Sequence, residues 1–168
     1  AGLDSGTTAL KRLFPHAAGV TLNLYDPAAM TEPSIHRAQR AQVTAPTALA
    51  SRPDQFPVSN TAADTVFLLL AAHEIRDPAL RAAFADELFR IVEPGGQVIL
   101  VEHLRDAANF VAFGPGAWHF YSRRTWDNLA VDHGFTVASS RMITPFVRAA
   151  IWRKKPWTQN CTYASPVP

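Results

Sequence analysis

The amino-acid sequence predicts an α/β domain built on a mainly parallel sheet, with helices on both faces and an antiparallel strand near its C-terminal end. The chain has 168 residues, the length of about one domain. Short apolar blocks alternate along it with helix-like segments, a pattern typical of parallel sheets. The last two strand-like blocks are separated only by Thr144 and Pro145, which leave no room for a crossover helix, so these strands should pair antiparallel.

The first half of the chain predicts two strands with a helix between them. Val20–Leu24 predicts a strand, which stops at the turn signal Tyr25-Asp26-Pro27. Residues 28–42 predict a helix that starts near Pro33, because proline suits the first turn of a helix. Thr65–Leu70 is a short apolar block, so it predicts a strand whose side chains are all buried between helices on both faces.

The second half continues the alternation. Asp77 followed by Pro78 predicts a helix start, and the apolar positions of this helix recur at steps of three and four residues. The helix should stop at Glu93-Pro94-Gly95-Gly96, which signals a tight turn. A strand, a helix and two final strands should follow, at Gln97–Val101, Ser122–His133, Thr136–Ile143 and Phe146–Arg153. Residues 1–155 should thus form one α/β domain, and residues 156–168 an irregular C-terminal tail.

The composition excludes several classes of protein. The chain carries 16 basic and 14 acidic side chains, and a net charge of +2 is too small to predict a nucleic-acid partner. Its longest apolar run, Val66–Ala72, is far shorter than the ~20 residues that span a bilayer, so no membrane partner is predicted. The N-terminus shows no secretory leader, and the single Cys161 excludes an intramolecular disulfide. We expect a cytoplasmic protein, for which the sequence leaves a homo-oligomer open.

Two long motifs resemble the class I S-adenosylmethionine-dependent methyltransferases. Ala63-Asp-Thr-Val-Phe-Leu-Leu-Leu70 and Glu87-Leu-Phe-Arg-Ile-Val-Glu-Pro-Gly-Gly-Gln-Val-Ile-Leu-Val-Glu102 are similar to the fourth strand of that family and to its following helix and fifth strand. The match runs from about Gly2 to Arg153. The motifs at 102–106, 109–116 and 119–126 resemble a bacterial small-molecule subgroup of methyltransferase type 11. The resemblance implies a Rossmann-like fold and S-adenosyl-L-methionine as the cofactor.

The same resemblance implies where the cofactor binds. Gly2-Leu-Asp4-Ser5-Gly6 is similar to the glycine-rich loop of the family, so Gly2, Ser5 and Gly6 should contact the cofactor. Asp26 matches the acidic residue that binds the ribose hydroxyls, at the end of the second strand. The chain departs from the family at Asp4, where the loop often has a glycine, and after the third strand, where no carboxylate occurs before Asp54.

The family also has a strand directly before its glycine-rich loop, whereas this chain begins at the loop. We therefore expect the first strand of the family to be absent from the given chain. The natural protein is then longer, or another chain completes the sheet, or the fold tolerates a central gap. The gap is the least favoured of these, because it would leave buried backbone groups unpaired at about 1–3 kcal/mol each.

Charged residues and histidines follow two strands that should be neighbours. His73-Glu74 comes after Thr65–Leu70, and Glu102-His103 comes after Gln97–Val101. A histidine at this edge could act as the general base in methyl transfer, because its pKa lies near neutral pH. We therefore propose His73 and His103 as catalytic residues and Glu74 and Glu102 as substrate-binding residues. In the alternative interpretation, Arg76 and Arg105 pair with the acidic residues, and the histidines cap helices or line the sheet edge.

A metal site is not predicted from these residues, because adjacent side chains on a strand point in opposite directions. The segment from Asn109 to Trp126 is rich in aromatic residues and holds Gly114-Pro115-Gly116. It could form a wall of the substrate pocket, with His119 as a third catalytic candidate and Tyr121 as a substrate contact. The alternative is that its rings pack a long loop onto the sheet.

The sequence thus predicts an enzyme that transfers a methyl group from S-adenosyl-L-methionine to a small molecule. The cofactor carries an activated methyl group, so the protein mainly has to align the reactants and remove a proton where the nucleophile requires it. The alternative function is a non-catalytic or degenerate methyltransferase-fold module for binding or assembly, which Asp4 and the absent first strand favour.

Overall fold

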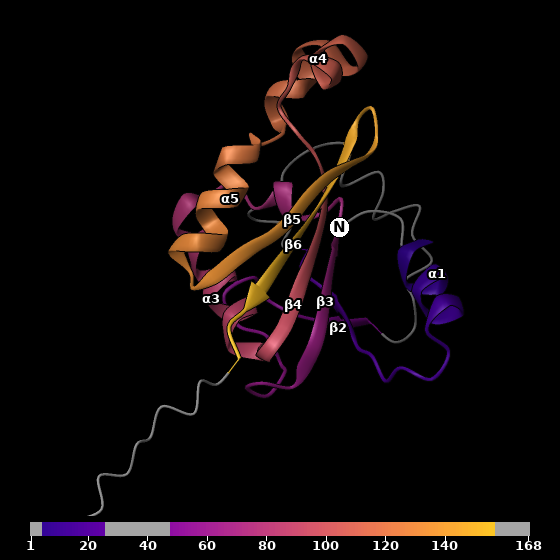
Figure 1. Ribbon diagram of the computed structural model, residues 1–168, viewed down its shortest axis with the longest axis vertical. Coiled ribbons are helices and arrows are strands. Elements are labelled where there is room, and N and C mark those ends of the chain that lie inside the picture. The colour runs from indigo at the N-terminus through magenta and orange to yellow at the C-terminus, as the bar shows by residue number, and fades with distance from the viewer. Residues whose placement is uncertain (1–4, 26–47, 157–168) are drawn as a thin grey trace, which may run out of the picture.

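The computed structural model of the chain describes residues 5–25 and 48–156, which form two sheets and the helices around them (Figure 1). The strands are β1 (Thr21–Asn23), β2 (Ala48–Ala50), β3 (Ala63–Leu69), β4 (Val92–His103), β5 (Phe135–Thr144) and β6 (Val147–Lys154). The α-helices are α1 (Ser5–Leu13), α3 (Pro78–Ile91), α4 (Ala107–Phe113) and α5 (Arg123–Asp132). Two 3₁₀-helices, η1 (Ala72–Glu74) and η2 (Gly114–His119), follow β3 and α4.

The larger sheet has the strand order β3-β4-β6-β5. β3 pairs parallel with β4, whereas β6 pairs antiparallel with both β4 and β5. β3, β4 and β5 therefore run in one direction and β6 in the other. This confirms the predicted fold class, a mainly parallel sheet with an antiparallel C-terminal strand, and the predicted hairpin around Thr144 and Pro145.

Helices lie on both sides of this sheet: α3 and α5 on one side and α1 on the other (Figure 1). The side of α3 and α5 holds the buried core, to which β4 contributes Val98 and Leu100 and β6 contributes Trp152. On the other side, Phe14 just after α1 packs against Phe67 of β3, with 6.2 Å between the ring centroids.

The first residues of α3 and α5 are capped at the positions where the sequence predicts that these helices begin. The Asp77 carboxylate accepts a hydrogen bond from the backbone N–H of Leu80, and Pro78 occupies the first turn. Ser122 caps α5 in the same way, through the N–H of Thr125 at 3.1 Å. The residue that follows α3, Val92, already begins β4, so the predicted tight turn at Pro94-Gly95-Gly96 lies within the range of this strand.

The prediction that every side chain of residues 66–70 is buried is wrong. Leu69 is 37% exposed, and Leu70, 43% exposed, lies beyond the end of β3 with a φ of 51°. Val66 and Leu68 pack on the core, whereas among the described residues the opposite face of the strand meets Gly6 of α1 and Phe14 just after it. These contacts leave Leu69 partly open to solvent.

β1 and β2 form a separate parallel pair, and within the described residues no strand pairing joins this pair to the larger sheet. β2 and α4 were not predicted as separate elements from the sequence. The predicted helix at residues 28–42, Gly2, Asp26 and the tail from residue 157 lie outside the described residues. No helix in the part of the chain that the structure describes has the length and apolar character needed to cross a membrane.

Candidate active site

The carboxyl ends of β3 and β4 emerge at the same edge of the sheet, because the two strands pair parallel. After β3 the chain turns into η1, which carries His73 and Glu74. Glu102 and His103 are the last two residues of β4. The structure therefore brings the two pairs that the sequence singled out to neighbouring positions on this edge.

Glu102 is buried at this edge, with 1% of its surface exposed. Its Oε2 lies 2.7 Å from Nδ1 of His73. Its Oε1 accepts hydrogen bonds from the backbone N–H groups of Ala71 at 3.0 Å, Ala72 at 2.8 Å and His73 at 3.4 Å. Both carboxylate oxygens are thus engaged within the protein, so the geometry does not favour the substrate contact expected for Glu102.

The other nitrogen of His73, Nε2, faces the carboxylate of Glu74 at 3.4 Å. Burial alone would lower the pKa of His73, but hydrogen bonds and charges of Glu102 and Glu74 outweigh it and raise this pKa to about 9. Burial likewise raises the pKa of Glu74, but contact with His73 and the nearby charge of His119 lower it overall. At neutral pH the site therefore holds an imidazolium ion between two carboxylates.

A phenylalanine ring separates the two candidate histidines. Phe120 meets the His73 ring edge-on at 5.5 Å and stacks on the His103 ring at 5.0 Å between centroids. His103 also contacts the ring of Phe113, and its Nδ1 lies 2.9 Å from the carbonyl oxygen of Phe146. His73 and His103 thus lie at one edge but do not face a common point.

Arginines connect the loops that follow β3 and β4. Arg81 donates to the hydroxyl of Tyr121 at 2.6 Å, and this hydroxyl also lies 3.2 Å from the carbonyl oxygen of Ile75. Arg76 donates to the carbonyl oxygen of His119 in η2. Among the described residues, Arg76 therefore binds a backbone carbonyl group, and Arg105 lies 5.9 Å from the ring centre of Trp118, instead of the ion pairs that the alternative interpretation gave these two arginines. The hydroxyl of Tyr121 is engaged within the protein.

The segment after β4 exposes apolar side chains beside this cluster. Val111 is 87% exposed and Trp118 63%, and Phe110 and Phe113 are about half exposed. Asn109, which is buried, donates to the carbonyl oxygen of Phe146 and so ties α4 to the turn between β5 and β6. In Figure 1, α4 projects beyond the end of the sheet. The rings of this segment thus pack partly on the sheet edge and partly face solvent.

A separate hollow of about 530 Å³ lies after the carboxyl ends of β1 and β2. Its lining residues are Tyr25, Ala50, Ser51, Arg52, Gln55, Phe56 and Pro57. None of the candidate histidines lines it. Its volume falls in the range of about 300–1,000 Å³ that is usual for small-molecule sites. The ring of Tyr25, the hydroxyl of Ser51 and the amide of Gln55 are groups of the kind that bind a nucleoside, whereas the ring of Phe56 is buried against Phe84.

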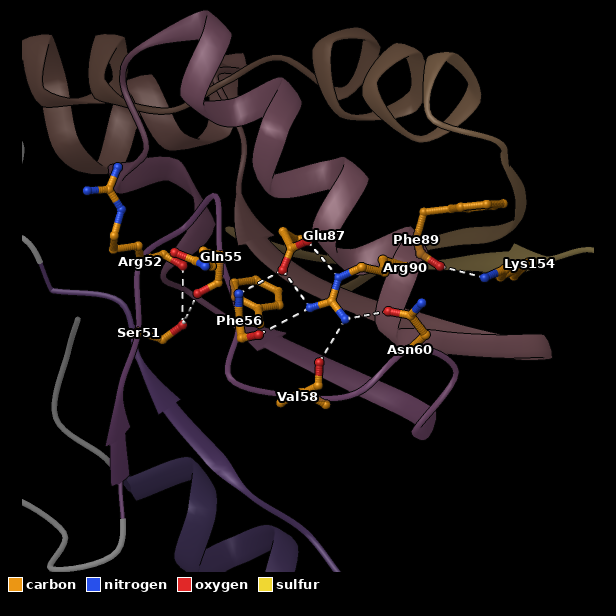
Figure 2. Close-up of polar contacts among 10 residues, drawn as sticks. All are labelled: Ser51, Arg52, Gln55, Phe56, Val58, Asn60, Glu87, Phe89, Arg90 and Lys154. Atoms are coloured by element: carbon orange, nitrogen blue, oxygen red, sulfur yellow. Dashed lines mark hydrogen bonds and ion pairs between the residues drawn. The ribbon is translucent and has the colours of Figure 1, made fainter.

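Two residues of α3 hold the chain that lines this hollow (Figure 2). The Glu87 carboxylate accepts from the backbone N–H of Phe56 at 2.7 Å. Arg90 donates to the carbonyl oxygen of Val58 and to the side chain of Asn60. Residues 56–60 therefore run alongside α3 in the same direction as the helix. Because α3 leads away from the carboxyl end of β3, the Phe56 end of this segment, which lines the hollow, is the end nearer to the edge that carries His73. No sequence signal linked these two α3 residues to the loop.

The residues that the resemblance assigned to the cofactor are described only in part. Ser5 begins α1, and a Cβ added to Gly6 would lie 2.8 Å from Cδ1 of Leu69, so this glycine permits α1 to approach β3. Gly2 and Asp26 lie outside the described residues. Within residues 5–25 and 48–156, no three His, Cys, Asp or Glu side chains are grouped as metal ligands.

Comparison with known proteins identifies the fold. No protein-family model matches the sequence, and no curated protein matches it. A SAM-dependent methyltransferase from Aquifex aeolicus superimposes with a TM-score of 0.64 at 15% identity, covering 88% of this chain and 74% of that one. A SAM-dependent methyltransferase from Methanosarcina mazei gives 0.64 at 14% identity, with coverages of 93% and 91%.

A third similar structure is the 1,6-didemethyltoxoflavin-N1-methyltransferase of Burkholderia thailandensis, with bound 1,6-didemethyltoxoflavin and S-adenosylhomocysteine. Its TM-score is 0.62 at 14% identity, and the match covers 92% of this chain and 69% of that one. The chain therefore has the fold of class I SAM-dependent methyltransferases, as the sequence motifs implied.

Proposed function

We propose that this protein transfers a methyl group from S-adenosyl-L-methionine to a small-molecule acceptor. The observation that carries the proposal is the fold that the chain shares with methyltransferases, one of which holds S-adenosylhomocysteine and 1,6-didemethyltoxoflavin. The cluster of ionisable groups at the carboxyl edge of β3 and β4 supports it, because ligands of open α/β sheets bind outside this edge.

The residues around the hollow fit the nucleoside part of the cofactor. Tyr25 offers an aromatic face to a base, and the side chains of Ser51 and Gln55 offer hydrogen-bonding groups. Gly2, Ser5, Gly6 and Asp26 are proposed as further contacts on the basis of the resemblance. When bound, the cofactor supplies a methyl group on a sulfonium ion, already activated for transfer.

The residues of the β3–β4 edge would serve the acceptor. His73, His103 and His119 remain the candidates for moving a proton, and the half-buried Glu74 is the carboxylate placed to contact the acceptor. Tyr121 would contribute through its ring rather than its hydroxyl, which Arg81 already holds. The single Cys161 supports a cytoplasmic location for this reaction.

Isothermal titration with S-adenosylhomocysteine tests the proposal directly. We expect saturable binding by the wild-type protein and weaker binding by Asp26→Ala and Gln55→Ala. Gly19→Ala, in an open position of the chain, is the control that should bind like the wild type. A folded wild-type protein that gives no heat with this ligand would contradict the proposed function.

The second candidate function is a non-catalytic module that keeps the methyltransferase fold. The internal hydrogen bonds of Glu102 and Tyr121 favour it, because groups engaged within the protein stabilise the fold without needing a ligand. The same titration separates the two functions when it is followed by an assay of S-adenosylhomocysteine production with a panel of small aromatic acceptors. Binding of the cofactor without turnover on any acceptor favours the module.

A further inference from the structure

We infer that Glu102 is a positioning residue, which keeps the proton of neutral His73 on Nδ1 and turns Nε2 of His73 toward the acceptor side of the site. This inference rests on the proposed function, because it names the group that orients the proton-transfer residue of that same site. It concerns only residues of this chain, so it can be tested without the cofactor, by finding which ring nitrogen of neutral His73 carries the proton.

The orientation of the Glu102 carboxylate is determined by the backbone. Three consecutive N–H groups, of Ala71, Ala72 and His73, converge on its Oε1, so this oxygen cannot turn away without leaving buried donors unpaired. The second oxygen must then face Nδ1 of His73, at 2.7 Å. An ionised carboxylate only accepts hydrogen bonds, so Nδ1 has to donate. In the neutral imidazole the lone pair is therefore on Nε2.

The environment of Nε2 differs from that of Nδ1. Nε2 lies 3.4 Å from the carboxylate of Glu74, whose side chain is 16% exposed, and this contact is longer than the 2.7 Å contact on the other side. Glu74 is also the carboxylate that the charge of His119 influences. An acceptor that displaces Glu74 would reach Nε2. When His73 is neutral, above its pKa of about 9, a proton lost by the acceptor forms a bond to Nε2, and the new positive charge is stabilised by Glu102 until the proton passes to solvent.

Further charged side chains lie near Glu102, on the side away from His73. Arg148 is its partner across the β4–β6 pairing, and Arg123 and Asp127 of α5 line the same small space of about 10 Å³ next to it. On this side the Glu102 carboxylate thus faces two arginines and one aspartate, an excess of positive charge.

Glu102→Gln tests the inference with little change of shape. The amide oxygen can keep the three backbone N–H contacts, so the NH₂ group must face His73 and donate to Nδ1. The proton of neutral His73 then moves to Nε2. At a pH above the pKa of His73, we expect ¹⁵N NMR spectra, assigned with His73→Gln, to show Nδ1–H in the wild type and Nε2–H in Glu102→Gln. Glu93→Gln removes an exposed carboxylate at the other end of β4 and should leave the tautomer unchanged.

A structural role alone predicts a different result: lower stability of Glu102→Gln with the His73 tautomer and titration unchanged, which would overturn the inference. The wild-type spectrum above the pKa of His73 is a second test that needs no variant. A neutral His73 protonated on Nε2 would overturn it even if Glu102→Gln did not fold.

Kinetics then separate this inference from the proposed function. At a pH above the pKa of His73, where this histidine is neutral, Glu102→Gln should bind S-adenosylhomocysteine like the wild type and lose turnover by about 10²–10⁴-fold, the usual contribution of a general base. Glu102→Asp should recover part of the rate, since it restores an acceptor. A wild type that binds no S-adenosylhomocysteine would end the proposed function but leave the tautomer result standing. Normal turnover by a folded Glu102→Gln would overturn the positioning role alone.

Discussion

Glu87 and Arg90, one turn apart on α3, form a two-point ion pair in which Nε and Nη2 of Arg90 each lie 2.7 Å from a carboxylate oxygen. The pair also holds a loop far away in sequence, through the N–H of Phe56, 31 residues before Glu87, and the carbonyl oxygen of Val58 (Figure 2). Because this loop lines the hollow beside β1 and β2, a helix surface determines the shape of a proposed ligand site.

Arg90→Met should destabilise the protein by about 1.5–3 kcal/mol, the usual worth of hydrogen bonds to a charged group. Arg123→Met is the matched control, because the Arg123 side chain is 58% exposed and forms its ion pair with Asp127 of its own helix, so about 0–1 kcal/mol is expected. Urea denaturation of both variants measures the difference. Equal losses for the two would show that Arg90 does not hold the loop.

Acid should remove the stabilisation that the Glu87–Arg90 ion pair gives to the fold. Arg90 lowers the pKa of Glu87 from its usual 4.5, so the stabilisation is present above pH 4.5 and is lost as the pH falls through the lowered pKa. The difference in unfolding free energy between wild type and Arg90→Met should therefore be constant near neutral pH and shrink in acid. A difference that grows as the pH falls would contradict this sign.

His73 should make stability depend on pH in the opposite direction. Its pKa is raised from 6.5 to about 9, so its contribution is complete below pH 6.5 and is lost as the pH rises through 9. Between these limits the stability advantage of the wild type over His73→Gln should fall by about 3 kcal/mol, at 1.36 kcal/mol for each pKa unit. The exposed His16→Gln is the control, and denaturant unfolding at pH 6, 7.5 and 9 is the measurement.

Gly96→Ala should destabilise the protein by about 1–3 kcal/mol or more, as overpacking does. A Cβ at this position would lie 2.8 Å from the carbonyl oxygen of Asp64 and 2.9 Å from that of Glu93, which are backbone atoms that cannot rotate away. Gly19→Ala meets nothing within 4 Å and should leave the melting temperature nearly unchanged. Similar melting temperatures for the two variants would mean that β3 and β4 are not this close at Gly96.

Leu100→Ala should cost about 2–5 kcal/mol, the range for a large-to-small change in a core, because Leu100 is only 2% exposed. Leu69→Ala should cost less than this range, because Leu69 is 37% exposed at the edge of the sheet. Chemical denaturation of both variants gives the comparison. A larger loss for Leu69→Ala would show that the outer face of β3 is covered.

Much of the fold could be predicted because its signals are local. The cap at Asp77 with Pro78 marks the start of α3, and the two-residue gap at Thr144 and Pro145 requires a hairpin. The motif from Glu87 to Glu102 also indicated the methyltransferase fold. These features depend on neighbouring residues, or on the rule that parallel strands need a crossover.

The candidate site was predictable in position but not in role. The sequence by itself determined that His73, Glu74, Glu102 and His103 lie at one edge, since they follow two parallel strands. Only the tertiary structure decided that Glu102 is buried under three N–H groups, that Phe120 separates the histidines, that Leu69 reaches solvent and that Glu87 holds a distant loop. Hydrogen-bond partners and burial depend on chain segments that meet only after folding, and no local pattern encodes which segments these are.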